Sequence, residues 1–491
     1  MKKKVLALLL AGLMLFSACG NVTPDTPTPD EENMNTRISI PWDSEKGFDM
    51  IEMADDDNYA VSRLVFDSLF ELDENYKPVP VLAESVSFSG NNCTVAIRQG
   101  ISFHNGQTLT ATDVQYTVNL HLENEKSPYH KKLSQISEVR VDSRYAVTFV
   151  LDSENGMFAH NLDFPIIRNG ASDLASTGTG RYVYTKKGLS EYLEKNKSYY
   201  DAENTLIDKI YLVNARDELH VDYFNDQSVT LIPQKQNLFN TDIKAYNPVG
   251  TFISNKLTYL SVNTQSAALA SPQIRSVISY AISRTGILNN FSATKAYTTY
   301  SVINPISYLY DAAAVNAGAT DLPDELLSGL GYIKDEAGMY VTLSVLVNSA
   351  NYEEHIIARG MAESLADLGI NISIDSKGGA DYEKAVKNKK YDMRFNNAKI
   401  SSDLDLTELL AENGMLTDTL SSLIGALKAA TTDENRKSAA FSLLKELDRY
   451  TPVIPLYFTT VEYISNDADR GELAPTPTSP LGKIWQMSKK S

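Results

Sequence analysis

The stretch from 357 to 374 constrains the fold of this chain more than any other part. Its apolar residues first recur at helical spacing and then alternate as in a half-buried strand. The helical set is Ile357, Met361, Leu365 and Leu368, and the alternating set is Ile370, Ile372 and Ile374. Gly369 lies between the two sets, where it can end the helix. A helix that leads through a glycine directly into a strand is typical of α/β layers, so we expect an α/β fold.

Two other regions have recognisable patterns. From 61 to about 151, short runs of alternating apolar residues predict several strands. One helix fits among them, because Thr110 and Asp113 have the spacing of a capping box. The pattern changes near Pro272, where a proline suited to the first turn of a helix precedes an apolar stripe at helical spacing. We therefore expect a change of architecture near this residue.

The composition limits the possible partners. The chain has 491 residues, a formal net charge of −17 and a pI near 4.9. An acidic surface repels nucleic acid and anionic lipid, so we expect no nucleic-acid partner. The length is sufficient for two or three lobes with cores of their own. Of the two cysteines, Cys93 alternates with Val95 and Ile97, which predicts a small buried residue on one face of a strand.

The first residues have the features of an export signal. Three lysines follow Met1, an apolar run extends over 5–16, and small residues lead to Cys19. The run is short for a helix that spans a bilayer. Its end resembles a bacterial lipobox, with Phe16 where leucine is more usual, and this implies a lipoprotein signal peptide at 1–19 and lipid on Cys19. The alternative is an ordinary signal peptide with a chance cysteine. The acidic, proline-rich segment 20–35 is expected to be a disordered tether.

Several motifs of enzymes and cofactor sites are missing. The sequence has no HExxH, no GxSxG and no phosphate-loop motif. The six histidines are scattered without metal-ligand spacing. The acidic run 55–57 lacks the glycine and glutamate of a calcium loop, and we interpret it as a solvated face. The sequence therefore predicts no catalytic residue, no metal site and no cofactor.

An ordered set of phrases resembles one protein family. The strongest is IRQGISFHNGQTLTATDVQYTV at 97–118. It resembles the block LRxGVxFHDGxPLTAxDVxxS of the family 5 extracytoplasmic solute-binding proteins, which include the oligopeptide, dipeptide and nickel binders of ABC importers. Other blocks of that family are matched in the expected order at 64–85, 177–182, 195–201, 274–288, 365–374 and 391–393. The residues of the first phrase also indicate a strand, a turn and a helix, so we interpret it as scaffold.

The resemblance implies a periplasmic-binding-protein-like fold of type II. In that fold two α/β lobes flank a cleft and are joined by two strands, and an extra domain is inserted in the first lobe. Carried onto this chain, the first lobe comprises 36–60, 177–265 and 465–491. The inserted domain comprises 61–176, and the second lobe comprises 266–464.

The resemblance also implies a function. We expect a monomeric, lipid-anchored protein on the extracytoplasmic side of the cell membrane. It would capture a solute by closure of the lobes and deliver it to the transmembrane subunits of an ABC permease. A peptide is the solute expected first, because peptide-binding members hold an extended backbone with strand-like hydrogen bonds. A metal chelate or an oligosaccharide is the alternative solute, and a surface hydrolase or a purely interacting surface lipoprotein is the alternative class of protein.

Seven residues are candidate ligand contacts. Many members carry a W-x-x-D-Y-x-D-P stretch whose aspartate pairs with the peptide amino group, and its counterpart here is KISSDLDL at 399–406, without the tryptophan and the proline. Asp403 or Asp405 could supply the charge, or one of them could cap a helix. The other candidates could stack on a ligand or simply pack in a core. They are Trp42, Tyr297, Tyr300, Phe395 and Asn396.

Overall fold

The computed structural model describes residues 37–53, 55–171, 178–234, 243–284, 286, 296–315 and 324–487. Contacts divide the chain into Met1–Arg37 and Ile38–Ser491, and the elements below belong to the second unit. The expected signal peptide at 1–19, its Cys19 and the expected tether at 20–35 lie outside the described residues. Within the described part of the chain, no helix has both the length and the apolar character that crossing a bilayer requires.

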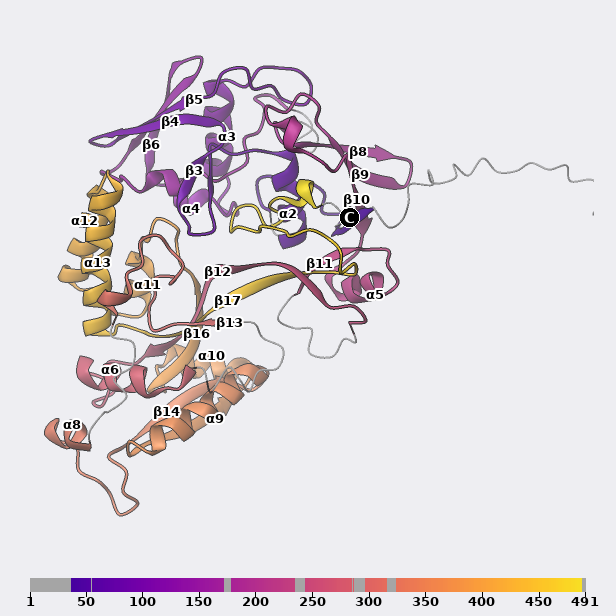
Figure 1. Cartoon of the computed structure of the whole chain (residues 1–491). Helices are drawn as coiled ribbons and strands as arrows, with labels where there is room; N and C mark the ends of the chain where they lie inside the picture. Colours follow the sequence, from indigo (N-terminus) through magenta and orange to yellow (C-terminus); the bar gives the residue numbers. More distant parts are fainter. Residues whose placement is uncertain are drawn as a thin grey trace, which may run out of the picture. The chain divides into compact units, whose positions relative to one another are not determined.

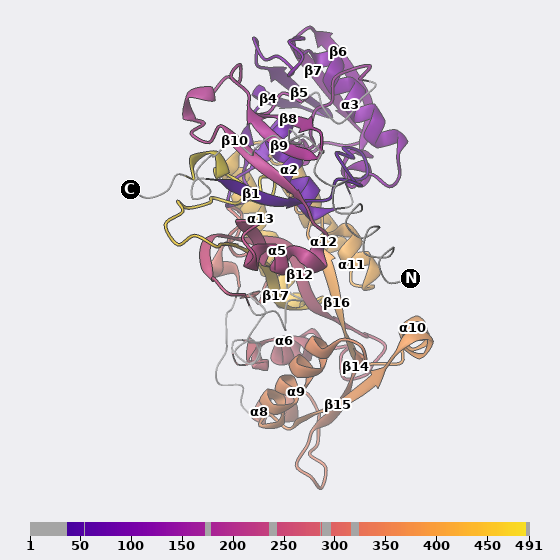
Figure 2. The same cartoon turned by 90° about the vertical axis from the view of Figure 1, so that its right-hand side faces the viewer.

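The first strand belongs to a four-stranded sheet (Figure 2). The strands, in sheet order, are β1 (Ile38–Trp42), β10 (Lys209–Asn214), β9 (Ser190–Lys195) and β8 (Tyr182–Lys187). β1 is buried along its whole length and runs parallel to β10, whereas the other two pairings are antiparallel. Parallel strands end at the same edge of a sheet. The segments that follow β1 and β10 therefore start side by side.

The strand-rich region predicted at 61–151 is confirmed. Its antiparallel sheet has the order β4 (Ala83–Ser89), β5 (Asn92–Ile97), β7 (Ala146–Leu151) and β6 (Ile136–Ser143), and a smaller sheet pairs β2 (Phe70–Leu72) with β3 (Pro78–Pro80). Cys93 is fully buried on β5, as the alternation predicted. α3 (Ala111–Glu123) packs on β6 and β7. Its capping box is present, because the Thr110 N–H donates to Asp113 Oδ2 at 2.8 Å.

The largest sheet contains strands from distant parts of the sequence (Figure 1). Its order is β11 (Leu231–Gln234), β17 (Ile454–Ser465), β12 (Asn247–Val262), β16 (Met393–Lys399), β14 (Val341–Asn348) and β15 (Ile370–Lys377), and β13 (Ala296–Thr298) pairs with β17. β14 runs parallel to both β15 and β16, and the other pairings are antiparallel.

Helices connect and cover these sheets. The α-helices not yet given are α2 (Asp56–Val65), α4 (His130–Leu133), α5 (His220–Asn225), α6 (Pro272–Ala281), α8 (Asp324–Gly329), α9 (Tyr352–Ala366), α10 (Gly379–Lys387), α11 (Thr407–Glu412), α12 (Asp418–Ala429) and α13 (Asp433–Tyr450). Short 3₁₀ helices are η2 (Phe158–Asn161), η3 (Ala202–Asn204), η4 (Asp217–Leu219), η5 (Ala312–Ala314) and η6 (Ile484–Gln486).

The helix–glycine–strand prediction is confirmed by α9 and β15. α9 ends at Ala366, Gly369 has a φ of 72°, and β15 begins at Ile370. That φ lies in the left-handed region, which glycine enters without steric penalty. Because β14 and β15 are parallel and α9 connects them, this part of the chain is a β–α–β unit. The mixed α/β fold class predicted from the sequence is confirmed.

The helices α12 and α13 pack side by side (Figure 1). The short segment 156–157, which follows the strand-rich region, contacts them. Met157 is buried in the same apolar cluster as Leu257 of β12 and Leu443 of α13. The N–H of Gly156 donates to the carbonyl of Lys428 at 2.6 Å. The segment 156–157, just after the strand-rich region, therefore packs on elements that lie far away in the sequence.

Candidate functional site

Two long strands, β12 and β17, link the ends of the largest sheet. The two strands pair with each other over most of their length, and one end of each also pairs with a different neighbour on its other side. β12 pairs with β16 over 256–262, and β17 pairs with β11 over 462–465. A change of bend in these two strands would therefore move β11 relative to β16, β14 and β15.

The pairing of β12 with β17 is irregular near its middle. Ile253 is opposite Thr460 and Leu257 is opposite Phe458, so four steps along β12 correspond to two along β17. Extra residues of this kind bend a strand and interrupt its ladder of hydrogen bonds. The irregular stretch is thus the natural place for the two strands to flex.

Two side chains and one backbone N–H from other segments donate hydrogen bonds to the backbone of this irregular stretch. Tyr76 Oη donates to the carbonyl of Ile253 at 2.7 Å. Asn304 Nδ2 donates to the carbonyl of Ser254 at 3.2 Å. The N–H of Ile400 donates to the carbonyl of Asn255 at 2.9 Å. These bonds satisfy backbone carbonyls that have no partner in the interrupted ladder.

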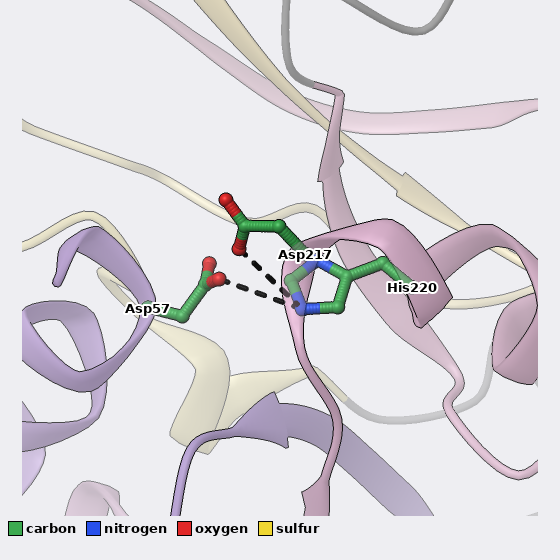
Figure 3. A group of neighbouring side chains, drawn as sticks. All are labelled: Asp57, Asp217 and His220. Atoms are coloured by element: carbon green, nitrogen blue, oxygen red, sulfur yellow. Dashed lines mark ion pairs between the residues drawn. The ribbon is translucent and has the colours of Figure 1, made fainter. Parts of the chain in front are cut away.

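Three polar side chains meet beyond the carboxyl ends of β1 and β10 (Figure 3). Asp57 belongs to the first turn of α2, which follows β1. Asp217 and His220 belong to η4 and α5, which follow β10. His220 Nε2 lies 3.6 Å from Asp57 Oδ2 and 3.9 Å from Asp217 Oδ1. Ligands of open α/β sheets bind in this position, outside the carboxyl ends of the strands.

A pocket of about 230 Å³, its mouth included, connects this edge with β17. Among the residues that line it are Pro41 of β1, Asp57 and Val61 of α2, Pro233 of β11 and Tyr463 of β17. The lining is mostly apolar, and Asp57 contributes a carboxylate. The pocket therefore lies between the carboxyl edge of the β1 sheet and one of the two linking strands.

A model of the bacterial extracellular solute-binding proteins, family 5 (middle region), matches residues 77–408, which is more than half of the chain. The chain belongs to this family. The resemblance found in the sequence is thereby confirmed. Family 5 members are non-catalytic extracellular binders of ABC transport, so the surface hydrolase considered as an alternative is wrong.

Individual relatives agree with this assignment. The oligopeptide-binding protein OppA of Bacillus subtilis is 21% identical, and the alignment covers 97% of this chain and 98% of OppA. A structure of the murein tripeptide-binding protein MppA, in an unliganded open form, has a TM-score of 0.77 at 14% identity, over 93% of this chain and 97% of MppA. A structure of NikA from Brucella suis with Fe(III)-EDTA has a TM-score of 0.66 at 16% identity, over 92% and 100%. At these identities the structures show the shared fold alone.

Trp42 of this solute-binding protein is packed in a core. Its side chain is 1% exposed, its Nε1 donates to Glu191 Oε2 at 2.7 Å, and its ring centroid lies 4.7 Å from that of Phe48. In this conformation Trp42 packs in the core, which was the alternative to a ligand contact. Contact with a ligand stays a prediction, and it requires the side chain to leave these neighbours.

Phe395 and Asn396 lie next to each other on β16 and point to opposite sides of the sheet. Phe395 is 3% exposed and packs in an apolar core. Asn396 is half-buried, and its Nδ2 donates to Tyr259 Oη at 2.9 Å. Of these two candidates, Asn396 is the one with surface left for a ligand.

Asp403 and Asp405 both have intramolecular partners. Asp403 is 3% exposed, and Asn161 Nδ2 donates to its Oδ2 at 2.8 Å. Asp405 accepts from Lys428 Nζ at 2.6 Å and from the N–H of Thr407, the first residue of α11, at 3.1 Å. Burial raises the pKa of Asp405, but the hydrogen bonds from Lys428 and Thr407 outweigh this and hold that pKa below its ordinary value. The cap-like alternative thus describes Asp405 in this conformation.

Tyr297 and Tyr300 differ in exposure. Tyr297 lies on β13 and is 42% exposed. Tyr300 is stacked on Tyr280 with ring centroids 5.4 Å apart, and the Arg284 guanidinium lies 3.9 Å from its centroid. Tyr300 also lines a pocket of about 370 Å³, mouth included, beside α13. Tyr297 is the more accessible candidate for stacking on a ligand.

No sequence pattern pointed to the group of Asp57, Asp217 and His220. The prediction that the acidic run 55–57 is a solvated face is wrong for Asp57, because that residue is 7% exposed. Spacing along the chain gives no signal here, since the partners lie in different parts of the sequence. Asp57 follows β1, and Asp217 and His220 follow β10. This order could suggest that they meet only if β1 and β10 were already known to be parallel neighbours.

Proposed function

We propose that this protein captures a peptide between two hinged lobes and delivers it to the transmembrane subunits of an ABC permease. The lobes are those expected from the sequence, with 36–60, 177–265 and 465–491 in the first, 266–464 in the second, and the domain at 61–176 inserted in the first. The protein acts as a monomer. It works outside the cell, held to the membrane by lipid on Cys19.

The observation that supports closure most directly is the irregular pairing of β12 with β17. β12 ends at Val262, just before the proposed boundary at 265/266, and β17 ends at Ser465, at the boundary where the chain returns to the first lobe. A ligand that contacts both lobes only in the closed state stabilises that state by those additional contacts. The irregular stretch around 253–257 lets the sheet bend without loss of the pairing on either side.

A peptide is favoured over other solutes by the relatives, since OppA and MppA are named for peptides. Peptide backbones offer regular donors and acceptors to half-buried polar side chains such as Asn396. The metal chelate in the NikA structure supports the alternative class of solute.

Peptides are expected to stabilise the protein against unfolding. A ligand at about 100 times its Kd raises the free energy of unfolding by about 2.7 kcal/mol, because it binds the folded state alone. Thermal unfolding should be followed with peptides of graded length, their N-acetylated forms, metal chelates and oligosaccharides. Mass spectrometry of small molecules released from the acid-denatured protein would name the natural solute.

The different ligands distinguish the possible classes of solute. If Asp405 pairs with the peptide amino group, N-acetylation of the peptide and the Asp405→Asn substitution should each weaken binding. The charge-matched control Glu336→Gln should leave binding unchanged. Stabilisation by chelates or oligosaccharides alone would contradict the peptide proposal. Absence of any shrinkage on ligand binding in small-angle scattering would contradict closure.

Lipid on Cys19 is expected to determine where the protein is found. Two or more acyl chains hold a protein stably at a membrane, since each buried methylene contributes about 0.8 kcal/mol. In the producing bacterium, wild type should fractionate with membranes and incorporate labelled fatty acid. Cys19→Ser should do neither. Cys93→Ser is the matched control, because Cys93 is fully buried, and it should behave as wild type. Equal membrane association of all three proteins would contradict the anchor.

A further inference from the structure

We propose that Asp57, Asp217 and His220 bind a divalent transition-metal ion. Figure 3 shows the two carboxylates and the imidazole converging from α2 and from the junction of η4 with α5. The chain itself would hold this ion, whichever solute the protein carries.

The distances within the group suit a shared ion. The three donor atoms lie within 4.8 Å of one another, with the imidazole nitrogen 3.6 Å and 3.9 Å from the two carboxylate oxygens. Zinc binds such donors at about 2.0–2.2 Å, so two donors on one tetrahedral ion lie about 3.4 Å apart. Small shifts therefore bring both carboxylates and the imidazole onto one ion. The Asp217 side chain is 59% exposed and can rotate to complete the contact.

Two of the three donors are held in place before any ion arrives. Asp57 and His220 are 7% and 3% exposed, so packing restricts their rotamers. The Asp57 N–H donates to Asp55 Oδ1 at 3.1 Å, which fixes the first turn of α2. Asn58 Nδ2 bonds that turn to the carbonyls of Asp43 and Gly47, at 2.9 and 2.8 Å. A site on restrained elements binds with less loss of conformational entropy.

The donor set selects the class of ion. Magnesium and calcium prefer oxygen donors throughout, whereas imidazole nitrogen suits zinc and nickel. Two carboxylates offset the charge of a divalent ion. Three protein donors leave a coordination position for water or a small ligand. Of the three residues, Asp57 also lines the pocket beside β17.

Metal uptake by the chelator-stripped full chain tests the proposal. Isothermal titration with Zn²⁺ and Ni²⁺, and metal analysis after desalting, should show one ion per chain, with far weaker binding of Mg²⁺. Asp217→Asn and His220→Ala should each weaken Zn²⁺ binding by at least the roughly 10–100-fold that loss of a residue supporting a ligand costs, because each alters a direct donor. His355→Ala, a histidine outside the group, should bind as wild type does.

Two results would overturn the proposal. One is a wild-type protein that takes up neither Zn²⁺ nor Ni²⁺, which would leave the group as a contact between the imidazole and the two carboxylates of the chain. The other is unchanged binding in Asp217→Asn, which would place any bound metal elsewhere. Asp217 is largely exposed, so this variant is expected to fold even if His220→Ala does not.

Discussion

Gly156→Ala is expected to lower the free energy of unfolding by about 3 kcal/mol, the upper part of the usual range for overpacking. A Cβ at position 156 would lie 2.2 Å from the carbonyl oxygen of Ala430 and 2.8 Å from its carbon. Both atoms belong to the backbone, so they cannot rotate away as a side chain would. The N–H of Gly156 also donates to the carbonyl of Lys428, and separation of the two segments would break that bond.

Gly425→Ala is the matched control for this experiment. Gly425 lies in α12, and a Cβ there would meet nothing within 4 Å. Alanine in a helix interior is favoured over glycine by about 1 kcal/mol, so this variant should be slightly more stable than wild type. Urea unfolding of the three proteins measures the difference. A Gly156→Ala protein as stable as wild type would mean that the backbone at Gly156 and at Ala430, just after α12, does not pack as closely as described.

Acidification from pH 6.5 to 4 is expected to destabilise the protein through two buried histidines. Burial lowers the pKa of His121 from 6.5 to about 4, and burial lowers the pKa of His160 to about 4 as well. In this window the unfolded chain binds protons that the folded protein does not, so stability falls as the pH falls. A shift of this size is worth about 3 kcal/mol for each histidine.

Asp67 acts in the opposite direction. Burial raises its pKa from 3.8 to about 6, with a smaller contribution from Glu71. Between these values the folded protein binds the proton and the unfolded chain does not, so this group adds stability as the pH falls from 6 to 4. This gain in the free energy of unfolding offsets the loss from about one of the two histidines. The net loss expected across the window is therefore about 3 kcal/mol.

Urea unfolding at a series of pH values measures this effect. His121→Gln should show a smaller loss of stability between pH 6.5 and 4, because a glutamine has no proton to take up. His355→Gln, a change outside the buried pair, should keep the pH dependence of wild type. A wild-type stability that is flat or rises on acidification would contradict the assignment of a neutral, buried His121.

The strand–turn–helix corner and the β–α–β unit could be predicted because short-range interactions decide them. The bond between Thr110 and Asp113 forms within one turn of helix. Gly369 ends α9 through its own backbone freedom. The alternation around Cys93 shows which side of β5 is buried, whatever covers it. Such features depend on residues a few positions apart, and that is also why the family blocks could be recognised.

The candidate site depends on contacts between segments that are distant in the sequence, and no local pattern encodes them. Asp57 meets His220 because β1 and β10 are parallel neighbours. Trp42 is buried because Glu191 and Phe48 happen to enclose it, although the residue type suits a ligand contact equally well. The sequence by itself determined the β–α–β unit and the strand–turn–helix corner, since both follow from local spacing, and it identified the family through blocks that resemble known members. Only the tertiary structure decided which polar groups converge, because packing of the whole chain sets which segments become neighbours.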